Sequence, residues 1–505
     1  MMDLLGMGFA KLFSSWEPFA FILLGVAIGT VIGALPGLSA TTGIVLLLPL
    51  TYGLDVSIGL LMLGGIYCGA LYGGSISAIL LGIPGTAAAL PTTFDGYPMS
   101  RQGRAYDALL AGLYGSSFGG ICSALCLMFL TPIIAHYAIK FGTAEMFLLG
   151  LWGMAMVTGV LGGDIVKGLC MAALGMLLGA VGPDPVNGVS RFTFGVSSLI
   201  GGFDIVPVML GALAMPRAYE MIEHFTDAEV FFQPQKERKF FIKPKEVIKR
   251  WFLLIRSALI GVVIGIAPAA GPAVAAMISY NTAAKSSKDP DSFGKGNIDG
   301  VWAAETANNG ATGGSLVLTL SLGVPGSAAA AVLMSALTLK GLTPGPLLLK
   351  SSASLCYEFF VGFLVANILV FVIGHAFVQV GGYVIKTPVK LLAPAILLIC
   401  LVGAWTASRM SGIIIALVIS IIAHLLAKFK FPMAPMLLGV ILYSIIEKNF
   451  HSYYQITQGH IERAFTRPMF LALFALVILT LALPPIITAV QKRRGKVYDS
   501  DPNEE

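Results

Sequence analysis

Neutral polar side chains gather around a few glycine-proline pairs in a chain that is otherwise strongly apolar. Ser39 and Thr41 follow the pair Pro36-Gly37, and Thr86 follows the pair Pro84-Gly85. Hydroxyl and amide groups can hold an ion without carrying a full charge of their own. The candidate substrate-binding residues are Ser39, Thr41, Ser75, Ser77, Pro84, Gly85, Thr86, Asn308, Asn309, Ser315, Pro325, Gly326 and Ser327.

The same interruptions supply candidates for binding a coupling cation. A helix N-terminus presents free amides and the positive end of the helix dipole, which suit a carboxylate. A helix C-terminus presents carbonyl oxygens, which suit a sodium ion. The candidate cation-coupling residues are Pro36, Gly37, Pro268, Glu305 and Thr312, and a sodium ion near the breaks would have ligands that the sequence leaves open. No cofactor is expected.

Glu305 is the sharpest single candidate. It opens an apolar helix together with Asn308 and Asn309, and a carboxylate inside a membrane is by default a functional group. Cation coordination or proton coupling would use its charge. The alternative is that Glu305 lies at the interface, in the first helical turn, where a carboxylate complements the helix dipole. Both interpretations stay open at this point.

Glycine and proline should end helices inside the membrane at 34–37 and 83–86. Proline removes a backbone donor, and glycine loosens the helix. The freed backbone groups cannot face hydrocarbon, so they must line a cavity or be buried in protein. For any one serine or threonine, close packing between helices is the competing explanation. The repeated breaks taken as a set favour a binding site.

Two blocks of sequence recur in the same order in the two halves of the chain. GTVIGALPGLSA from Gly29 matches GVVIGIAPAAGP from Gly261 at the glycines and the proline. GGSISAILLGIPGTAAA from Gly73 matches GGSLVLTLSLGVPGSAAA from Gly313 after one inserted residue. Corresponding interruptions in two halves of a membrane protein indicate a binding site near the middle of the bilayer.

Composition decides the environment of these elements. The chain has 505 residues, of which 56% are hydrophobic and 11% are charged, so it cannot form an ordinary water-exposed surface. A membrane core of roughly 30 Å takes about 20 apolar residues per helix, which gives about ten to twelve crossings. The apolar runs do not alternate as barrel strands do. We expect an all-α integral membrane protein with two internal repeats, each with broken or re-entrant helices.

A basic stretch near the middle divides the chain. We expect repeat half 1 at 1–216, a basic cytoplasmic linker at 217–251, repeat half 2 with the C-terminal helices at 252–490 and a cytoplasmic tail at 491–505. Lysine and arginine place both basic segments in the cytoplasm. Segments 106–140 and 353–385 are long enough for one tilted helix or a broken pair. The six cysteines lie in apolar stretches and are expected to pack.

Other classes of membrane protein fit less well. An ATP-driven pump needs a GxxxxGK[ST] loop, and the sequence has none. An intramembrane protease would need a spaced Gly-x-Gly-Asp or an HExxH motif, which are also absent. A channel is conceivable, because broken helices also build filters. Two-fold repetition with hydroxyl-rich breaks favours a polytopic helical transporter that works by alternating access.

Several motifs together resemble the large membrane subunit of the tripartite tricarboxylate transporter family. They are GALPGLSATTG from Gly33, GGSISAILLGIPGT from Gly73, DGYPMSRQGRA from Asp95, AAETANNGATGG from Ala303, LGVPGSAAAA from Leu322 and LKGLTPGPLL from Leu339. The family's glycine-proline motifs fall on Pro36, Gly37, Pro84, Gly85, Pro325 and Gly326, and its acidic-amide motif falls on Glu305, Asn308 and Asn309.

The resemblance implies a multi-pass secondary carrier of the bacterial inner membrane rather than an enzyme. Such a carrier works with a small membrane subunit and a periplasmic solute-binding protein, and it moves citrate and other carboxylates inward. A sodium gradient is the expected driving force, and a proton gradient is the alternative. Pro268 departs from the pattern, because the sequence there reads Pro268-Ala269-Ala270-Gly271 without an immediate proline-glycine pair.

Overall fold

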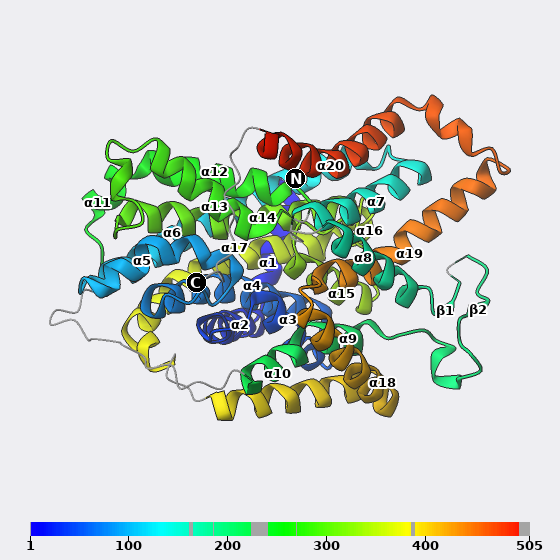
Figure 1. The fold of residues 1–505 in the computed structure, drawn as a ribbon, viewed down its shortest axis with the longest axis horizontal. Coiled ribbons are helices and arrows are strands. Elements are labelled where there is room, and N and C mark those ends of the chain that lie inside the picture. The colour runs from blue at the N-terminus through cyan, green and yellow to red at the C-terminus, as the bar shows by residue number, and fades with distance from the viewer. Residues whose placement is uncertain are drawn as a thin grey trace.

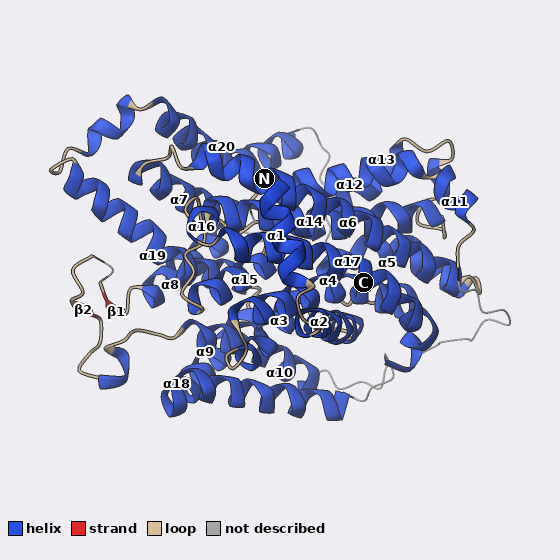
Figure 2. Ribbon diagram, turned by 180° about the vertical axis from the view of Figure 1, so that it is seen from behind, coloured by secondary structure: helices blue, strands red, loops and turns tan. Residues whose placement is uncertain are grey.

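The computed structural model describes residues 2–160, 165–184, 186–223, 241–268, 270–384 and 389–493. Nearly all regular structure in these ranges is helical, and one two-stranded sheet accompanies it (Figure 2). The predicted all-α class is therefore confirmed. Seven helices of the described residues are long and apolar enough to cross a membrane. The chain is a multi-pass membrane protein.

The first half of the chain contains the helices up to α10. Its elements are α1 (Met2–Leu12), α2 (Glu17–Ala34), α3 (Ala40–Leu47), η1 (Leu48–Thr51), α4 (Val56–Leu81), η2 (Ala87–Ala89), α5 (Leu90–Arg101), α6 (Ala105–Ala138), α7 (Thr143–Val160), α8 (Ile165–Gly179), β1 (Gly182–Pro183), β2 (Ser190–Arg191), η3 (Ser197–Leu199), α9 (Ile205–Met209), the π-helical turn η4 (Leu210–Ala214) and α10 (Met215–Glu223).

The second half begins with a short helix outside the membrane segments. Its elements are α11 (Pro244–Lys249), α12 (Trp251–Ile266), α13 (Gly271–Lys285), η5 (Pro290–Ser292), α14 (Ile298–Leu322), α15 (Ala328–Leu339), α16 (Leu348–Ser351), α17 (Ala353–Val384), α18 (Val389–Lys428), α19 (Met433–Ile456), η6 (Ile461–Thr466) and α20 (Pro468–Arg493).

Helices α4 and α14 form the centre of the molecule. Every described residue of α14 from Gly300 to Leu322 is buried, and α4 is buried along nearly its whole length. Helix α2 packs along α4, and α12 packs along α14. Helix α17 covers another face of α4, as α6 covers another face of α14. Each central helix therefore has one of these neighbours from its own half of the chain and one from the other half.

Glycines let the two helix pairs approach at backbone distance. A Cβ atom on Gly29 would lie 2.4 Å from the carbonyl oxygen of Ile66, and one on Gly33 would lie 2.0 Å from that of Ala70. In the second pair, a Cβ on Gly265 would lie 2.4 Å from the carbonyl oxygen of Ala311. Such contacts exclude any side chain and give membrane helices their close packing.

The long apolar segments resolve in different ways. Segments 106–140 and 353–385 are each covered by one continuous helix, α6 and α17, so neither is a broken pair. Helix α18 instead changes direction at Ser408 and Arg409, whose backbone is not helical. Apolar helices of 10–17 residues accompany the seven long ones, among them Trp251–Ile266 and Ala328–Leu339. The expected ten to twelve crossings would require some of these shorter helices to cross as well.

The β1–β2 hairpin and α11 lie at opposite ends of the longest axis of the molecule (Figure 1). The two strands are antiparallel, with Gly182 paired to Arg191 and Pro183 paired to Ser190. Helix α10 runs to Glu223, inside the stretch expected to be a linker, and α11 lies near the other end of that stretch. Residues 224–240 and the basic tail from Arg494 lie outside the described residues.

Candidate functional site

The first predicted break separates α2 from α3. Helix α2 ends at Ala34, and Leu35 is already extended, with φ of −83° and ψ of 121°. Gly37 takes a positive φ of 85°, a conformation that few residues other than glycine adopt. Ser39 then caps α3, because its hydroxyl oxygen accepts a hydrogen bond from the amide of Thr42 at 3.1 Å. Pro36 and Gly37 thus reverse the chain and aim a new helix N-terminus inward.

The second break has the same build with a different sequence. Helix α12 ends at Ile266, and Ala267 is extended, with φ of −68° and ψ of 127°. Pro268 is buried in the turn that follows. Gly271 supplies the positive φ, here 63°, as the first residue of α13. The missing proline-glycine pair is therefore replaced by a glycine three residues later.

Two hairpin turns complete the arrangement. Helices α4 and α14 each end at a glycine in the left-handed region, Gly82 with φ of 71° and Gly323 with φ of 72°. After each turn comes a glycine that lies against the end of a broken helix. A Cβ atom on Gly85 would lie 2.1 Å from the carbonyl oxygen of Gly33, and one on Gly326 would lie 2.7 Å from that of Gly265. Each of the two hairpins therefore packs closely against the end of one broken helix.

Four chain segments that each begin a helix meet around one cavity of about 130 Å³. They are the starts of α3, η2 with α5 behind it, α13 and α15. The lining residues are Ser39, Ala40, Thr41, Thr86, Ala87, Ala88, Ala270, Gly271, Pro272, Ala273, Ser327, Ala328 and Ala329, with Tyr67 and Leu71 from α4. Helix N-termini carry free amides and partial positive charge. The cavity is therefore suited to an anion, although no charged side chain is among its lining residues.

Tyr67 connects the hydroxyl groups beside the cavity. Its hydroxyl lies 3.1 Å from the Oγ of Ser315 and 3.1 Å from the Oγ of Ser327. Ser327 also caps α15 by accepting a hydrogen bond from the amide of Ala330 at 3.1 Å. Tyr67 is wholly buried, and a buried tyrosine hydroxyl normally requires such partners. The central helices of both halves thus contribute to one hydrogen-bonded group.

Glu305 lies elsewhere, in a wholly buried polar cluster between α14, α5 and α6. Its Oε1 accepts a hydrogen bond from the Oγ1 of Thr92 at 2.5 Å, and its Oε2 accepts one from the Oγ of Ser116 at 3.0 Å. The Nδ2 of Asn308 lies 3.3 Å from the same Oε2. Helix α14 begins at Ile298, two turns earlier. Glu305 therefore does not lie in the first helical turn, as the alternative interpretation required.

Residues 19–438 match the tripartite tricarboxylate transporter TctA family. The chain belongs to this family. A transporter family of membrane proteins is thereby indicated, rather than an enzyme family, and the tripartite architecture of the family implies association with further components.

Two proteins of Agrobacterium vitis are similar to this TctA-family chain. One is described as an uncharacterized 52.8 kDa protein in the TAR-I ttuC' 3' region, and it is 32% identical over 99% of both chains. The other, from the TAR-II ttuC' 3' region, is 27% identical over 48% of this chain and 100% of its own length. No solved structure matches the chain.

The predicted site residues of the TctA-family chain fall into three places. Ser39, Thr41, Thr86 and Ser327 line the cavity, and Ser315 adjoins it through Tyr67. The residues of the turns that lead to it are Pro36, Gly37, Pro84, Gly85, Pro268, Pro325 and Gly326. Glu305 and Asn308 form the separate cluster described above, and the Nδ2 of Asn309 lies 3.3 Å from the backbone oxygen of Glu305.

The remaining predicted hydroxyls point to other helices or to their own backbone. Ser75 and Ser77 each donate a hydrogen bond to a carbonyl oxygen one turn earlier, at 2.7 Å and 3.3 Å. Thr312 lies between the carbonyl oxygen of Asn309 and the hydroxyl of Ser123 on α6. These three are not among the cavity-lining residues, and their contacts are those of packed membrane helices.

Sequence reasoning missed Tyr67 and the start of α13. A tyrosine hydroxyl in the apolar run of α4, two turns before Gly74, was the available signal for Tyr67, although Tyr72 offered the same signal. Ala270 to Ala273 contribute through backbone rather than through polar side chains, so residue types alone gave no indication of them.

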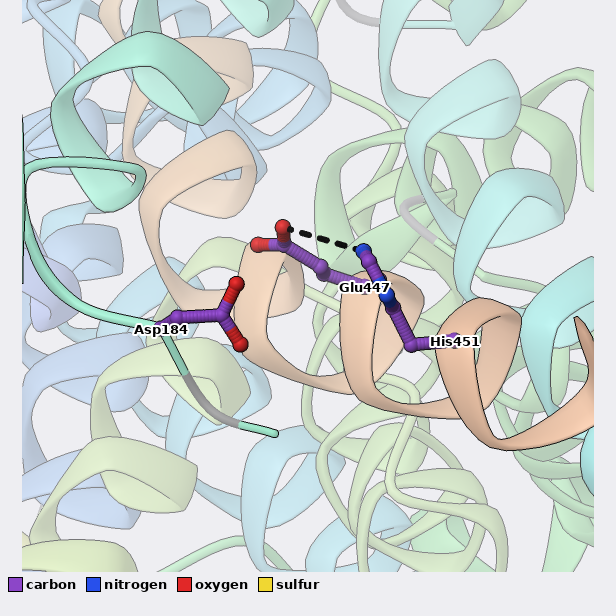
Figure 3. Close-up of side chains that lie close together, drawn as sticks. All are labelled: Asp184, Glu447 and His451. Carbon is purple, nitrogen blue, oxygen red and sulfur yellow. Dashed lines mark ion pairs between the residues drawn. The ribbon is translucent and has the colours of Figure 1, made fainter. Parts of the chain in front are cut away.

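A second polar cluster joins Asp184, Glu447 and His451 (Figure 3). One possible ligand atom from each lies within 4.8 Å of the others. The guanidinium of Arg191 lies between the two carboxylates, 2.7 Å from the Oε1 of Glu447 and 3.2 Å from the Oδ2 of Asp184. The amides of Asn187 and Val186 hold the pKa of Asp184 below its usual value. Because Arg191 on the β1–β2 hairpin bonds to Glu447 on α19, the cluster attaches the hairpin to this helix.

Proposed function

We propose that this protein is the large permease subunit of a binding-protein-dependent secondary transporter. It would import tricarboxylates or related small carboxylates across the bacterial inner membrane. The observation that carries the proposal is the meeting of four helix-initiating segments around one cavity, at the breaks and hairpins of both halves of the chain. Membership of the TctA family supports the substrate class.

The chemistry of the cavity favours a carboxylate over a cation. Hydroxyls of Ser39, Thr41 and Ser327 can donate hydrogen bonds, and free amides of four helix starts add further donors. No aspartate or glutamate is among the lining residues. A cation would gain little there, because the nearest partial charges are positive. The glycine-lined contacts between hairpins and breaks would let each half move as a unit during alternating access.

The driving force and the partners extend this proposal. A sodium gradient is the expected energy source, and the alternative is a proton-coupled carrier of organic anions, for which the buried Glu305 is the relevant group. A small membrane subunit and a periplasmic solute-binding protein would complete the transporter. The binding protein would deliver the carboxylate to the cavity from the periplasm. An ion channel or an intramembrane enzyme remains a weaker alternative.

Uptake of labelled mono-, di- and tricarboxylates tests the function. Cells would express the chain with its two partner subunits, with and without sodium in the medium. Accumulation of one anion that disappears when this chain is omitted is the expected result. Sodium dependence would identify the coupling ion, whereas collapse by an uncoupler alone would identify protons. Absence of uptake of every anion, with all subunits verified in the membrane, would contradict the proposal.

A further inference from the structure

Glu305 differs from the other buried glutamates in what compensates its charge. Glu358 has the Nζ of Lys11 at 2.7 Å, and Glu145 has the Nε of Arg467 at 3.0 Å. Among the described residues, no lysine, arginine or histidine nitrogen forms an ion pair with Glu305. A wholly buried carboxylate without a compensating cation is strongly disfavoured. The site therefore calls for a positive charge from outside the chain.

Oxygen atoms that could bind such a charge surround the carboxylate. Thr92 and Ser116 place their hydroxyls on the two carboxylate oxygens. The Oδ1 of Asn308 is buried without a hydrogen-bond partner, and the amide that carries it contacts Glu305 through its nitrogen. Carboxylate, hydroxyl and amide oxygens are the hard ligands that alkali and other hard cations prefer. An unpartnered amide oxygen beside a carboxylate that forms no ion pair in the described residues is a set of ligands that suits a hard cation.

The Glu305 cluster also contacts α5, and the segment that leads into α5 forms part of the wall of the carboxylate cavity. Thr92 lies in α5, and the segment that leads into α5 contributes Thr86, Ala87 and Ala88 to the cavity wall. A cation that holds Thr92 against α14 would therefore also hold the segment between Thr86 and α5 in place. Ser116 adds α6, which packs along α14. Neutralising Glu305 would thus act on the cavity through one short stretch of chain.

We propose that Glu305, Thr92, Ser116 and Asn308 form the binding site of the coupling cation, a single sodium ion or proton, whose occupancy seats α5 against α14 and completes the carboxylate cavity. The inference rests on the proposed carrier function. By linkage, the cation then raises the affinity for the carboxylate by the same factor as the carboxylate raises the affinity for the cation.

Other ionisable groups near Glu305 are already engaged. Tyr72 on α4 is an electrostatic neighbour of Glu305, and its hydroxyl donates to the carbonyl oxygen of Gly374 at 3.3 Å. Asp95 on α5 accepts hydrogen bonds from the amides of Gly296 and Asn297 and from the hydroxyl of Tyr280. On α6, the contact to the carboxylate is the neutral Ser116. Glu305 is therefore the group in this cluster whose negative charge a bound cation would compensate.

The first experiment measures the unfolding temperature of the purified full-length protein without any carboxylate present. Sodium chloride is titrated against choline chloride at constant ionic strength, and the series is repeated across neutral pH. The variant is Glu305→Gln, and the matched control is Glu358→Gln, which alters a buried glutamate with a lysine partner. An unfolding temperature that rises with sodium in wild type and control, but not in Glu305→Gln, supports a sodium site. A pH-dependent rise with the same pattern, without a sodium effect, supports a proton site.

Two results would overturn the proposal. One is a cation response in Glu305→Gln equal to that of the control, and the other is no response to sodium or pH in the wild-type protein. If Glu305→Gln fails to fold, Thr92→Val and Thr92→Ser replace it. Loss of the hydroxyl in Thr92→Val should raise the cation concentration that gives half of the rise in unfolding temperature by about tenfold. Thr92→Ser keeps the hydroxyl and should leave this concentration unchanged. Equal responses in these two variants would also contradict the site.

A second measurement separates this inference from the proposed function. Carboxylate binding to the purified protein is measured with and without the cation. In wild type the cation should tighten binding, and in Glu305→Gln the dependence on the cation should be lost. A cation response in unfolding temperature with no carboxylate bound by any variant would refute the carrier function and leave the cation site standing. Carboxylate binding that is indifferent to the cation in wild type would refute the coupling alone.

Discussion

Tyr67 holds the cavity together at the level of single side chains. One hydroxyl serves both Ser315 and Ser327, so it joins α4 of the first half to α14 and α15 of the second. Removing it would cost both serines a buried hydrogen-bond partner, although Ser315 would keep its bond to the carbonyl oxygen of Thr312 and Ser327 its bond from the amide of Ala330. The same helix carries a second buried tyrosine, Tyr72, whose hydroxyl faces α17 instead. The pair allows the cavity to be tested with substitutions of identical chemistry.

We expect Tyr67→Phe to weaken carboxylate binding by about tenfold, because one lost hydrogen bond in a buried site is worth about 1 kcal/mol or more. Tyr72→Phe should leave binding unchanged and cost a similar amount of stability. Isothermal titration with the transported anion measures the first effect, and thermal unfolding measures the second. Equal loss of affinity in both variants would show that Tyr67 acts through general packing.

Some residues that line the cavity could be predicted from sequence and others could not. Ser39 and Ser327 are hydroxyl residues that follow glycine-proline breaks, a pattern visible in the sequence, and in the structure each caps the helix that follows it. Ala270 and Gly271 were not identified, since a backbone amide gives no signal in residue type. Glu305 and Ser315 share a helix but belong to different sites, and only the three-dimensional partners Thr92 and Tyr67 separate them.

Among elements, the two hairpins make close contacts with the broken helices through Gly85 and Gly326. Gly85 and Gly326 lie against the ends of α2 and α12, so each hairpin is fixed where a broken helix stops. The breaks themselves were predictable, because proline and glycine occur there side by side or close together in an apolar run, whereas a single proline such as Pro132 is accommodated inside α6. The local build of the two halves matches at these turns, which supports the internal repeat that the sequence suggests. The repeat itself stays a prediction.

Gly85→Ala should abolish transport and destabilise the protein by about 1–3 kcal/mol, since overpacking a close contact costs this much. The added methyl group would lie 2.1 Å from a backbone oxygen and 2.5 Å from the Oγ of Ser77. Gly53→Ala is the control, because nothing lies within 4 Å of its Cβ position. Uptake and thermal unfolding are measured for both. Normal uptake by Gly85→Ala would contradict the close contact.

The β1–β2 hairpin depends on a single side chain for its attachment to α19. We expect Arg191→Ala to release it, because Asp184 and Glu447 would then repel each other without a bridging cation. Chymotrypsin should cut more rapidly at Phe192 and Phe194, which are exposed beside the strand. Arg463→Ala on η6 is the control. Unchanged cleavage in Arg191→Ala would show that other contacts hold the hairpin.

At the scale of the whole molecule, the hairpin and α11 mark opposite ends (Figure 1). The described residues between them in the sequence include one candidate membrane span, Ile205–Glu223. A single crossing would place its two flanks on opposite sides of a membrane. The positive-inside rule predicts that the basic residues near α11 lie in the cytoplasm, and the hairpin is then expected to face the periplasm.

Site-directed labelling tests this orientation. In a background without the six native cysteines, Ser197→Cys beside the hairpin should react with an impermeant maleimide in intact spheroplasts. Lys245→Cys on α11 should react only after lysis. Both positions are exposed in the structure, so accessibility should reflect the side of the membrane. Labelling of both from the same side would contradict a single crossing between them.

Contacts over long sequence distances were beyond sequence reasoning at this scale. The segment lengths of α6 and α17 could be read from apolar runs, but their pairing with α14 and α4 could not. Each pair joins residues of different halves, and no local pattern encodes that choice. The attachment of α19 to α8 is of the same kind.

The backbone-built cavity has a consequence for how the protein would respond to acidity. None of its lining side chains ionises near neutral pH, because they are serines, threonines, alanines, glycine, proline, leucine and one tyrosine. Its partial positive charge comes from fixed peptide dipoles, which no proton can remove. In Glu305→Gln, which lacks the proposed cation site, the pH profile of anion binding should therefore follow the acid dissociation of the ligand itself. The cavity would select the fully ionised form of a polyprotic acid, and acidification would lower the affinity of this variant by depleting that form in solution.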